Sequence, residues 1–343
     1  MNEIGYGLLG SGFMALTYAE CLARHVPNAR LVAAALGSRA GALAAEYDVP
    51  IEASAAALAG RDDVDAVIIA TPHSTHLPLA LEMAAAGKHV YLEKPMAIDV
   101  AECDAIIAAC DAAGVKLTVN KVTRYRESPN AARDLLVSGA IGELRSVRIT
   151  SSVIDYAPAK GSWAGKPGEG GAWLDMGVHL FDALRWYTGD EVETLFAKVT
   201  DHGGEAHLRR TGIAEAVLTG GVVAQMWVSL EMPSPGIGSQ SQWLLVGSRG
   251  IIECDSYGKV RLGRDGAWEE IYEMPPFGLN SDYHDPVRLK AFAAQTTDFA
   301  SAILDDRAPA VGGADGRTAV ALVEAAQHSS DSGEAVHPGP PAT

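Results

Sequence analysis

A short apolar segment that runs directly into a glycine-rich turn constrains the fold of this chain more than any other feature. Residues 4–9 form an apolar run typical of a buried strand, residues 10–15 read Gly-Ser-Gly-Phe-Met-Ala, and residues 13–24 have helical spacing. The first glycine permits a tight turn, the second lets the backbone approach a ligand, and the small third position lets the helix pack on the sheet. The pattern therefore predicts a strand–turn–helix unit.

A unit of this kind is suited to binding a pyrophosphate group. The N-terminus of its helix offers free N–H groups and the positive end of the helix dipole to phosphate oxygens. We therefore predict a dinucleotide-binding turn, and the residues expected to contact the dinucleotide there are Gly10, Gly12, Phe13 and Met14.

Strands and helices alternate through the rest of the first third of the chain. Further strands are predicted in residues 31–36, 65–70, 88–92 and 115–119, and a helix in residues 99–113. Alternation of this kind is typical of an α/β fold with a doubly wound parallel sheet. We therefore expect residues 1–120 to form a Rossmann domain.

The chain leaves the second predicted strand through Gly37, Ser38 and Arg39. A site that prefers NAD has an acidic residue about 20 residues beyond the glycines, where it binds the ribose 2′-hydroxyl. The next acidic residue here is Glu46, inside a helix. We assign Ser38 and Arg39 to the cofactor site, where a 2′-phosphate would favour NADP(H). In the alternative, Arg39 stacks on the adenine and the site accepts either NAD(H) or NADP(H).

The third strand, residues 65–70, runs into the sequence Thr-Pro-His-Ser-Thr-His. Its position predicts contacts with the nicotinamide half of the cofactor, and the residues assigned to them are Thr71, Pro72, His73 and His76. No cysteine or carboxylate accompanies the two histidines, so they do not predict a metal site. We predict no metal.

A lysine follows the next strand, in the sequence Tyr-Leu-Glu-Lys-Pro at residues 91–95. Open α/β sheets bind their ligands at the carboxyl ends of the strands. Pro95 restricts the backbone directly after the lysine. We therefore expect Glu93 and Lys94 to line the cofactor site, with Lys94 in the chemistry.

The pattern changes after residue 120. Strand-like segments separated by glycine turns dominate residues 144–262, and helices are predicted near the end of the chain. Runs of strands after an alternating half indicate a separate α+β domain. We therefore expect a substrate-binding domain in residues 121–330 and a flexible tail in residues 331–343.

Asp175 and His179 stand out in the second part of the chain. They are four residues apart, a spacing that places two side chains on one face of a helix. Taken singly, Asp175 could cap a helix N-terminus and His179 could be a buried core histidine. Their joint spacing, after two glycines, favours catalytic roles for both.

The motifs together resemble those of the Gfo/Idh/MocA oxidoreductases, in order and spacing. The matching sequences are Gly10-x-Gly12-x-x-Ala15, Ala70-Thr71-Pro72 with His76, Glu93-Lys94-Pro95 and Gly170-Gly171-x-x-x-Asp175-x-Gly177-x-His179. The resemblance implies a Rossmann domain followed by an α+β domain with a large, mostly antiparallel open sheet. It also implies an NAD(P) cofactor and hydride transfer at a carbon of a sugar, inositol or related polyol.

The resemblance also implies roles for individual residues. Lys94, Asp175 and His179 occupy the positions that line the reactive carbinol in the family. An imidazole titrates near neutral pH, so His179 is suited to accept the hydroxyl proton, while Lys94 stabilises the developing negative charge. Which of the two is the base stays open. Further substrate contacts are expected from Asn120, Arg124 and Tyr125.

Two other functions are compatible with the same motifs. Some relatives are NAD-dependent glycosidases, which oxidise a sugar transiently, eliminate the aglycone and reduce the product again. That chemistry needs an additional base, for which Tyr125 and Tyr156 are the candidates. A non-catalytic NADP sensor is the third possibility, and the intact set of Lys94, Asp175 and His179 argues against it.

The charge distribution suggests what the substrate carries. The chain has 343 residues and a formal charge of −16, which argues against nucleic acid and anionic membrane as partners. Residues 121–170 nevertheless carry a net charge of +3, against −19 for the remainder. An anionic substituent on the substrate is the resulting hypothesis, with Arg124 and Lys166 as its candidate contacts. Trp163 and Tyr156 are further predicted substrate contacts.

Cellular location and oligomeric state are inferred from the cysteines, from the apolar segments and from the family resemblance. The four cysteines are scattered, no apolar leader is recognised, and no apolar stretch is long enough to span a bilayer. We expect a cytoplasmic protein with reduced thiols. The family resemblance implies a homo-oligomer, either a dimer or a tetramer, built on the open sheet.

Overall fold

The computed structural model describes residues 3–154, 165–166, 169–202, 209–237, 240–277 and 282–339. The chain divides into two compact units. The first contains residues 1–122 and 277–317, and the second contains residues 123–276 and 318–343. Residues 277–317, which the sequence analysis assigned to the second domain, thus belong to the first unit.

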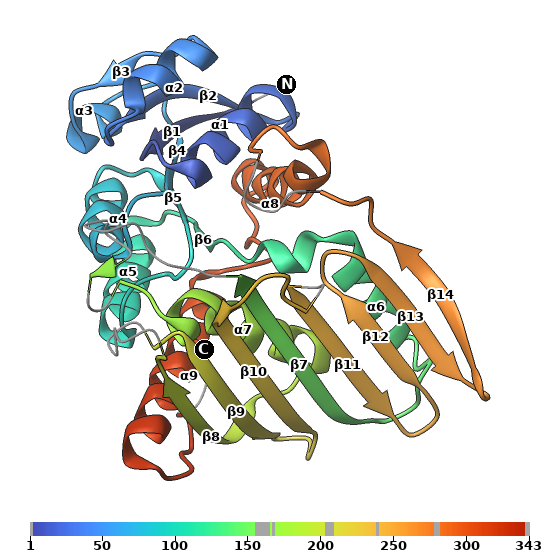
Figure 1. Cartoon of the computed structure of the whole chain (residues 1–343). Helices are drawn as coiled ribbons and strands as arrows, with labels where there is room; N and C mark the ends of the chain where they lie inside the picture. The colour runs from blue at the N-terminus through green and yellow to red at the C-terminus, as the bar shows by residue number, and fades with distance from the viewer. Residues whose placement is uncertain are drawn as a thin grey trace. The chain divides into compact units, whose positions relative to one another are not determined.

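The first unit contains a six-stranded parallel sheet in the order β3-β2-β1-β4-β5-β6 (Figure 1). Its strands are β1 (Ile4–Leu9), β2 (Ala29–Ala35), β3 (Ile51–Glu52), β4 (Ala66–Ile69), β5 (His89–Leu92) and β6 (Leu117–Val119). This is the strand order of a dinucleotide-binding doubly wound sheet, so the fold class predicted for this part is confirmed. The two-residue strand β3 was not predicted.

Helices flank this sheet, and their ends follow local sequence signals. They are α1 (Phe13–Arg24), α2 (Ala40–Tyr47), α3 (Ala55–Ala59), α4 (His76–Ala85), α5 (Val100–Ala113) and α8 (Pro286–Leu304). The Asp99 carboxylate accepts a hydrogen bond of 2.7 Å from the backbone N–H of Glu102 and begins α5. The fully apolar strands β1 and β4 are buried throughout, as expected for parallel strands covered on both faces.

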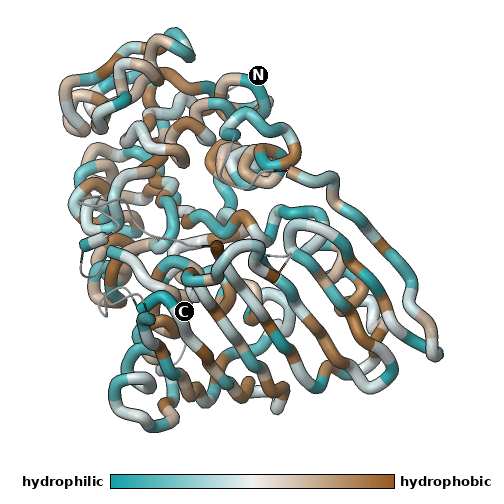
Figure 2. The backbone as a smooth tube through the Cα atoms, in the orientation of Figure 1, coloured by the Kyte–Doolittle hydropathy of each residue, from teal (hydrophilic) through white to brown (hydrophobic). Residues whose placement is uncertain are grey.

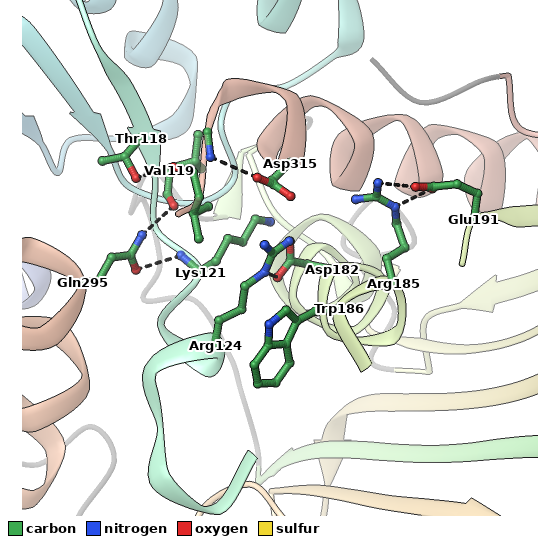
Figure 3. Close-up of polar contacts among 12 residues, drawn as sticks. Thr118, Val119, Lys121, Arg124, Asp182, Arg185, Trp186, Glu191, Gln295 and Asp315 are labelled. Atoms are coloured by element: carbon green, nitrogen blue, oxygen red, sulfur yellow. Dashed lines mark hydrogen bonds and ion pairs between the residues drawn. The ribbon is translucent and has the colours of Figure 1, made fainter. Parts of the chain in front are cut away.

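Helix α8 joins the first unit through its buried face. Phe299 on α8 lies edge-on to Tyr91 of β5, with ring centroids 5.9 Å apart. The Gln295 side chain donates to the Val119 carbonyl at 2.9 Å and accepts from the Lys121 backbone N–H at 3.1 Å (Figure 3). These contacts place a helix from the end of the chain on a sheet from its beginning, which local patterns do not reveal.

The second unit contains an eight-stranded sheet in the order β14-β13-β12-β11-β7-β10-β9-β8 (Figure 1). Its strands are β7 (Leu144–Ile154), β8 (Val192–Thr200), β9 (Thr211–Leu218), β10 (Val223–Met232), β11 (Ser241–Gly247), β12 (Ile251–Asp255), β13 (Lys259–Arg264) and β14 (Ala267–Glu273). Among the strand pairs of the described residues of this sheet, β7–β10 alone is parallel, so the predicted large and mostly antiparallel sheet is confirmed. The strands predicted here were residues 144–154, 192–199, 214–218, 222–231, 242–246 and 258–262. Strands β12 and β14 were not among them.

One face of this sheet is covered and the other is open. Buried and exposed residues alternate along β8 and β9. The exposed positions include the apolar side chains Phe196, Ile213 and Val217, and Figure 2 shows polar and apolar residues interspersed along the strands. Helix α6 (Glu127–Val137) packs on β12, β13 and β14, while the turn that precedes helix α7 (Val178–Thr188) packs on β9 and β10. The alternation of buried and exposed residues therefore indicates a sheet that is buried on one face.

The two edges of the sheet are protected differently. At β8, the Ser329 and Ser330 hydroxyls of α9 (Gly313–Ser332) accept hydrogen bonds from the backbone of Ala197 and Val199. Val336 then pairs with Leu195, so residues 333–339 do not form the loose tail that was expected. At the opposite edge, β14 carries exposed acidic residues, which discourage pairing with another chain. These residues are Glu269, Glu270 and Glu273.

Among the residues that the structure describes, no helix is both long enough and apolar enough to cross a membrane. Within the same part of the chain, no three His, Cys, Asp or Glu side chains gather in a way that would hold a metal ion.

Two leucines of α8 provide a test of its packing. Leu289 is 0 % exposed and Leu304 is 39 % exposed. We expect Leu289→Ala to lower the free energy of unfolding by about 2–5 kcal/mol, because it leaves a cavity in the core. Leu304→Ala should cost about 1 kcal/mol or less. Urea unfolding of both variants checks this, and equal losses would contradict the burial of the Leu289 face.

Candidate active site

The glycine turn after β1 has the shape that a dinucleotide needs. Gly10 has a φ of +117°, and a Cβ atom there would lie 2.4 Å from the Ala70 carbonyl oxygen, so glycine is required. A Cβ on Gly12 would meet nothing within 4 Å. No side chain caps the N-terminus of α1. The turn therefore combines open space with uncapped N–H groups, and it fits a pyrophosphate.

Ser11, which the sequence analysis did not select, connects this turn to the end of β2. Its buried hydroxyl accepts a hydrogen bond of 2.9 Å from the backbone N–H of Arg39. Gly37 lies so close that a Cβ there would be 2.2 Å from the Ser11 Oγ atom. The predicted cofactor residues Ser38 and Arg39 are both exposed in this turn. The structure thus brings residues 37–39 against the glycine turn.

Phe13 and Met14 are held from α8 rather than from the glycine turn itself. The Arg288 guanidinium lies 4.6 Å from the Phe13 ring centroid and 3.5 Å from the Met14 sulfur. Its other Nη atom donates to the Thr17 hydroxyl at 2.7 Å. Arg288 is 274 residues beyond Met14, so no local motif could have identified this buried cation beside the start of α1.

The turn after β4 is fixed by hydroxyl groups and by packing. The Thr75 hydroxyl lies 2.7 Å from the Thr71 hydroxyl and donates to the Pro72 carbonyl at 2.6 Å. His73, in the short 3-10 helix η1 (His73–Thr75), is buried with its ring centroid 5.8 Å from that of His76. Thr71 and Pro72 remain partly exposed, so these two can reach a ligand.

His76 lies beneath two loops and contacts both. Its Nε2 atom is 3.1 Å from the Thr71 carbonyl oxygen, and its Nδ1 atom is 3.0 Å from that of Pro95 and 3.3 Å from that of Met96. The side chain is 0 % exposed. His76 was predicted to bind the cofactor. In the structure its ring contacts the backbone carbonyls of the two loops.

Burial lowers the pKa of His76 below 6.5, because losing water disfavours the imidazolium. The backbone carbonyls and the Glu93 carboxylate act in the opposite direction and are outweighed. A neutral ring carries one N–H, so it donates to only one of the two loops at a time.

Glu93 fixes the backbone that carries Lys94. Its carboxylate is 5 % exposed and accepts three hydrogen bonds: from the Tyr18 hydroxyl at 2.7 Å, the Asn120 amide at 2.6 Å and the Lys94 backbone N–H at 2.8 Å. The Lys94–Pro95 peptide bond is cis. The Lys94 residue is itself partly exposed at the carboxyl end of β5. Its backbone is therefore held by the core.

Asp175 lies in the turn that leads into α7, and His179 lies in the first turn of α7 itself. Residues Ala172–Gly177 form the π-helix η4, and α7 follows directly. Helices of this type are often found at functional sites. Trp173 and Val178 in the same stretch are buried, whereas Asp175 and His179 are partly exposed. Asp175 lies inside the π-helical turn and not at a cap position, so the capping alternative does not describe it.

Arg124 is committed to an ion pair within the second unit. Its Nε and Nη2 atoms donate to the two oxygens of Asp182 at 2.9 and 2.6 Å, and Asp182 is 1 % exposed (Figure 3). Two further arginines of the basic segment, residues 121–170, lie over aromatic rings of the same unit. Arg126 lies 4.2 Å from the Tyr257 ring centroid, and Arg133 lies 5.0 Å from that of Trp186.

The remaining predicted substrate residues are placed as follows. Asn120 follows β6 and contacts Glu93, and Tyr125 ends the short helix η2 (Val122–Tyr125). Lys166 is exposed. Tyr156 and Trp163 lie outside the described residues.

The lowered pKa of His76 predicts a pH-dependent stability. The unfolded chain, with a histidine pKa near 6.5, binds the proton before the folded chain does. The stabilisation is therefore complete above about pH 6.5 and is lost as the pH falls below it, by up to about 1.4 kcal/mol per unit. Unfolding measured from pH 7.5 to 5 should show a shallower decline in His76→Gln than in the natural protein.

The exposed His328 supplies the control, because His328→Gln should keep the full decline. The pKa of His89 is also lowered by burial. Because His89 is present in all three proteins, its contribution to the pH dependence is the same in each and does not affect the comparison. An unchanged decline in His76→Gln would exclude this role for the buried ring.

Comparison with known proteins identifies the family of this chain. Residues 4–121 match the model of an oxidoreductase family with an NAD-binding Rossmann fold, and residues 130–253 match the Gfo/Idh/MocA C-terminal domain. The cofactor is therefore NAD(H) or NADP(H). The glycine turn, the 37–39 turn and the loops after β4 and β5 are the parts of the first unit suited to hold it.

Individual relatives match over most of the chain. An inositol 2-dehydrogenase of Rhizobium meliloti (strain 1021) is 27 % identical over 95 % of this chain and 96 % of its own length. A 2,7-anhydro-N-acetylneuraminate hydratase of Escherichia coli (strain K12) is 27 % identical over 76 % and 70 %. The crystal structure of the aldose-aldose oxidoreductase from Caulobacter crescentus complexed with glycerol superimposes with a TM-score of 0.83 at 25 % identity, covering 98 % and 100 %. The chain belongs to the Gfo/Idh/MocA family of oxidoreductases.

Proposed function

We propose that this protein is an NAD(P)-dependent dehydrogenase that acts on a secondary alcohol of a sugar, an inositol or a related polyol. The observation that carries the proposal is the partly exposed Lys94 at the carboxyl end of β5, with its backbone held by the buried Glu93. The named activities of the inositol and aldose relatives support a polyol or sugar substrate. When bound, the nicotinamide supplies or accepts the hydride.

The protein residues manage the proton and the substrate. The His179 imidazole accepts the hydroxyl proton, and the Lys94 ammonium donates a hydrogen bond to the substrate oxygen and stabilises its negative charge. Asp175 orients the substrate by accepting a hydrogen bond from a neighbouring hydroxyl. An arrangement in which Lys94 is the base and His179 the hydrogen-bond donor is the alternative within the same proposal.

Removal of either group should abolish most of the turnover. We expect Lys94→Ala and His179→Ala each to lower kcat by at least about 100-fold, the usual contribution of an acid–base group. Lys259→Ala and His328→Ala are the matched controls, because both residues are exposed and lie outside the proposed site. Steady-state rates with inositols and aldoses measure the effect. Normal turnover in either site variant would refute its assigned role.

A redox-neutral reaction is the second candidate, and the hydratase relative favours it. That relative's name describes addition of water and no net oxidation. An NAD-dependent glycosidase would likewise use transient oxidation, elimination and reduction, with Tyr125 or Tyr156 as the additional base. Cofactor that purifies with the protein, together with product formation and no net absorbance change at the NADH band, would identify this class. A non-catalytic NADP sensor is the third candidate, and it would show neither dehydrogenase activity nor glycoside cleavage.

We further propose an anionic substituent on the substrate. The neuraminate named for the hydratase relative is a carboxylate, and the exposed Lys166 supplies a cation. Arg124 contributes less than the sequence suggested, since Asp182 already balances its charge. We expect uronates to be turned over faster than the matching neutral sugars, and Lys166→Ala to raise KM for the uronates alone by about tenfold. Arg145→Ala, an exposed change on β7, is the control, and equal rates on both sugar classes would contradict the proposal.

Self-association as a dimer or tetramer is also proposed. The open face of the eight-stranded sheet has a shallow groove of about 640 Å³, lined in part by Phe196, Val217 and Val223. These three apolar side chains are exposed. An exposed apolar patch of this kind is typical of a protein–protein contact.

A further inference from the structure

Two contacts attach the π-helix η4 to the start of β9. The Ala172 backbone N–H, at the beginning of η4, donates to the Arg209 carbonyl at 2.9 Å. The buried Trp173 ring lies so close to Gly212 of β9 that a Cβ atom there would be 3.0 Å from the indole Nε1 atom. The position of η4 therefore depends on residues 209–212.

Trp173 in turn contacts the residues that lead into α7. A Cβ atom on Gly177 would be 2.7 Å from the Trp173 Cε3 atom, so the ring packs directly on that backbone. The Val178 backbone N–H donates to the Trp173 carbonyl. Asp175 lies inside this stretch and His179 follows it directly. A shift of the Trp173 ring would therefore displace both proposed active-site residues.

The backbone at Arg209 has a conformation that its surroundings must maintain. Its φ is +45°, in the left-handed region, which costs free energy for any residue with a Cβ atom. The Arg209 side chain donates to Asp331 of α9 at 2.9 Å, but this ion pair is exposed. Exposed ion pairs stabilise little by themselves. The neighbouring residue, Arg210, has the stronger contacts.

Arg210 joins the ends of three strands. Its Nε and Nη2 atoms donate to the two carboxylate oxygens of Asp201, directly after β8, at 2.7 and 3.0 Å. The Asp201 side chain is 0 % exposed. The Arg210 Nη2 atom also lies 3.4 Å from the Glu231 carboxylate of β10, which accepts from the Thr211 hydroxyl of β9 at 2.8 Å. A two-point contact between buried charges has one favourable geometry, so it fixes the backbone that carries it.

We propose that Arg210 and Asp201 are positioning residues, which hold residues 209–212 and, through them, the stretch that carries Asp175 and His179. They act through the Arg209 carbonyl and the Trp173 ring. The inference rests on the proposed function, and it adds two residues to the machinery of that same site.

A second ion pair of the same unit provides a matched control. Arg185, in the last turn of α7, donates through Nε and Nη2 to the two oxygens of Glu191, both at 2.5 Å (Figure 3). The Arg185 side chain is 15 % exposed, against 12 % for Arg210. Arg185→Ala and Arg210→Ala therefore remove equivalent pairs, and the pair removed by Arg185→Ala lies at the end of α7 away from η4.

Hydrogen exchange of the full-length protein, followed by mass spectrometry, tests the coupling without a substrate. We expect amides in residues 171–179 to exchange at least about tenfold faster in Arg210→Ala than in the natural protein, because the stretch opens more readily. Residues 251–264, in β12 and β13, serve as the internal reference and should not change. Arg185→Ala should leave the exchange of residues 171–179 as it is.

Turnover tests the consequence for the reaction. We expect Arg210→Ala to lower kcat by about tenfold or more, because a small misplacement of a reacting group is costly, with KM for the cofactor unchanged. Arg210→Lys, which keeps the charge but not the two-point contact, should fall between the two, and it replaces the alanine variant if that protein does not fold. The double variant with Asp201→Ala should lose no more than Arg210→Ala alone, since the pair acts as a unit.

Three results would overturn the proposal. Unchanged exchange of residues 171–179 in the Arg210 variants would exclude the coupling. Equally accelerated exchange in Arg185→Ala would indicate a general loss of stability. Accelerated exchange with normal turnover would exclude a positioning role. The exchange measurement needs no turnover, so a natural protein that oxidises no polyol would refute the proposed function and leave the coupling to be decided by exchange.

Discussion

A single buried carboxylate organises the carboxyl edge of the parallel sheet. Glu93 accepts hydrogen bonds from the Tyr18 hydroxyl of α1, the Asn120 amide after β6 and the Lys94 backbone N–H after β5. A buried carboxylate is costly unless such donors satisfy it, so the three elements must pack together before Glu93 is stable there. The backbone of Lys94, the lysine proposed for the chemistry, is therefore held in place by the core of the unit.

His76 extends this organisation to the next strand end, because its ring contacts the Thr71 carbonyl after β4 and the Pro95 carbonyl after β5. Ser11 provides the corresponding connection between the loops after β1 and β2. The loops of the candidate cofactor site are thus joined in pairs by buried side chains that no ligand need touch. Preorganisation of this type is what precise positioning of a reacting group requires.

The basic segment shows why a count of charges overestimates the charge available to a ligand. Arg124 is neutralised by Asp182, which lies 58 residues further along the chain, and Arg126 and Arg133 lie over aromatic rings. A pairing of this kind is invisible to a window that covers one segment. Lys166 is exposed and remains the described candidate for an anionic group.

Local patterns determined a large part of this protein. The strand–glycine–helix signal and the β–α alternation depend on neighbouring residues, so they predicted the parallel sheet, the turn containing Gly10 and Gly12, and the strand end that carries Lys94. The placement of α8 in the first unit, the support of α1 by Arg288 and the anchoring of Arg39 by Ser11 could not be predicted in the same way. Each depends on partners that only folding brings together, since a burial pattern shows that a side chain is covered but not which distant segment covers it.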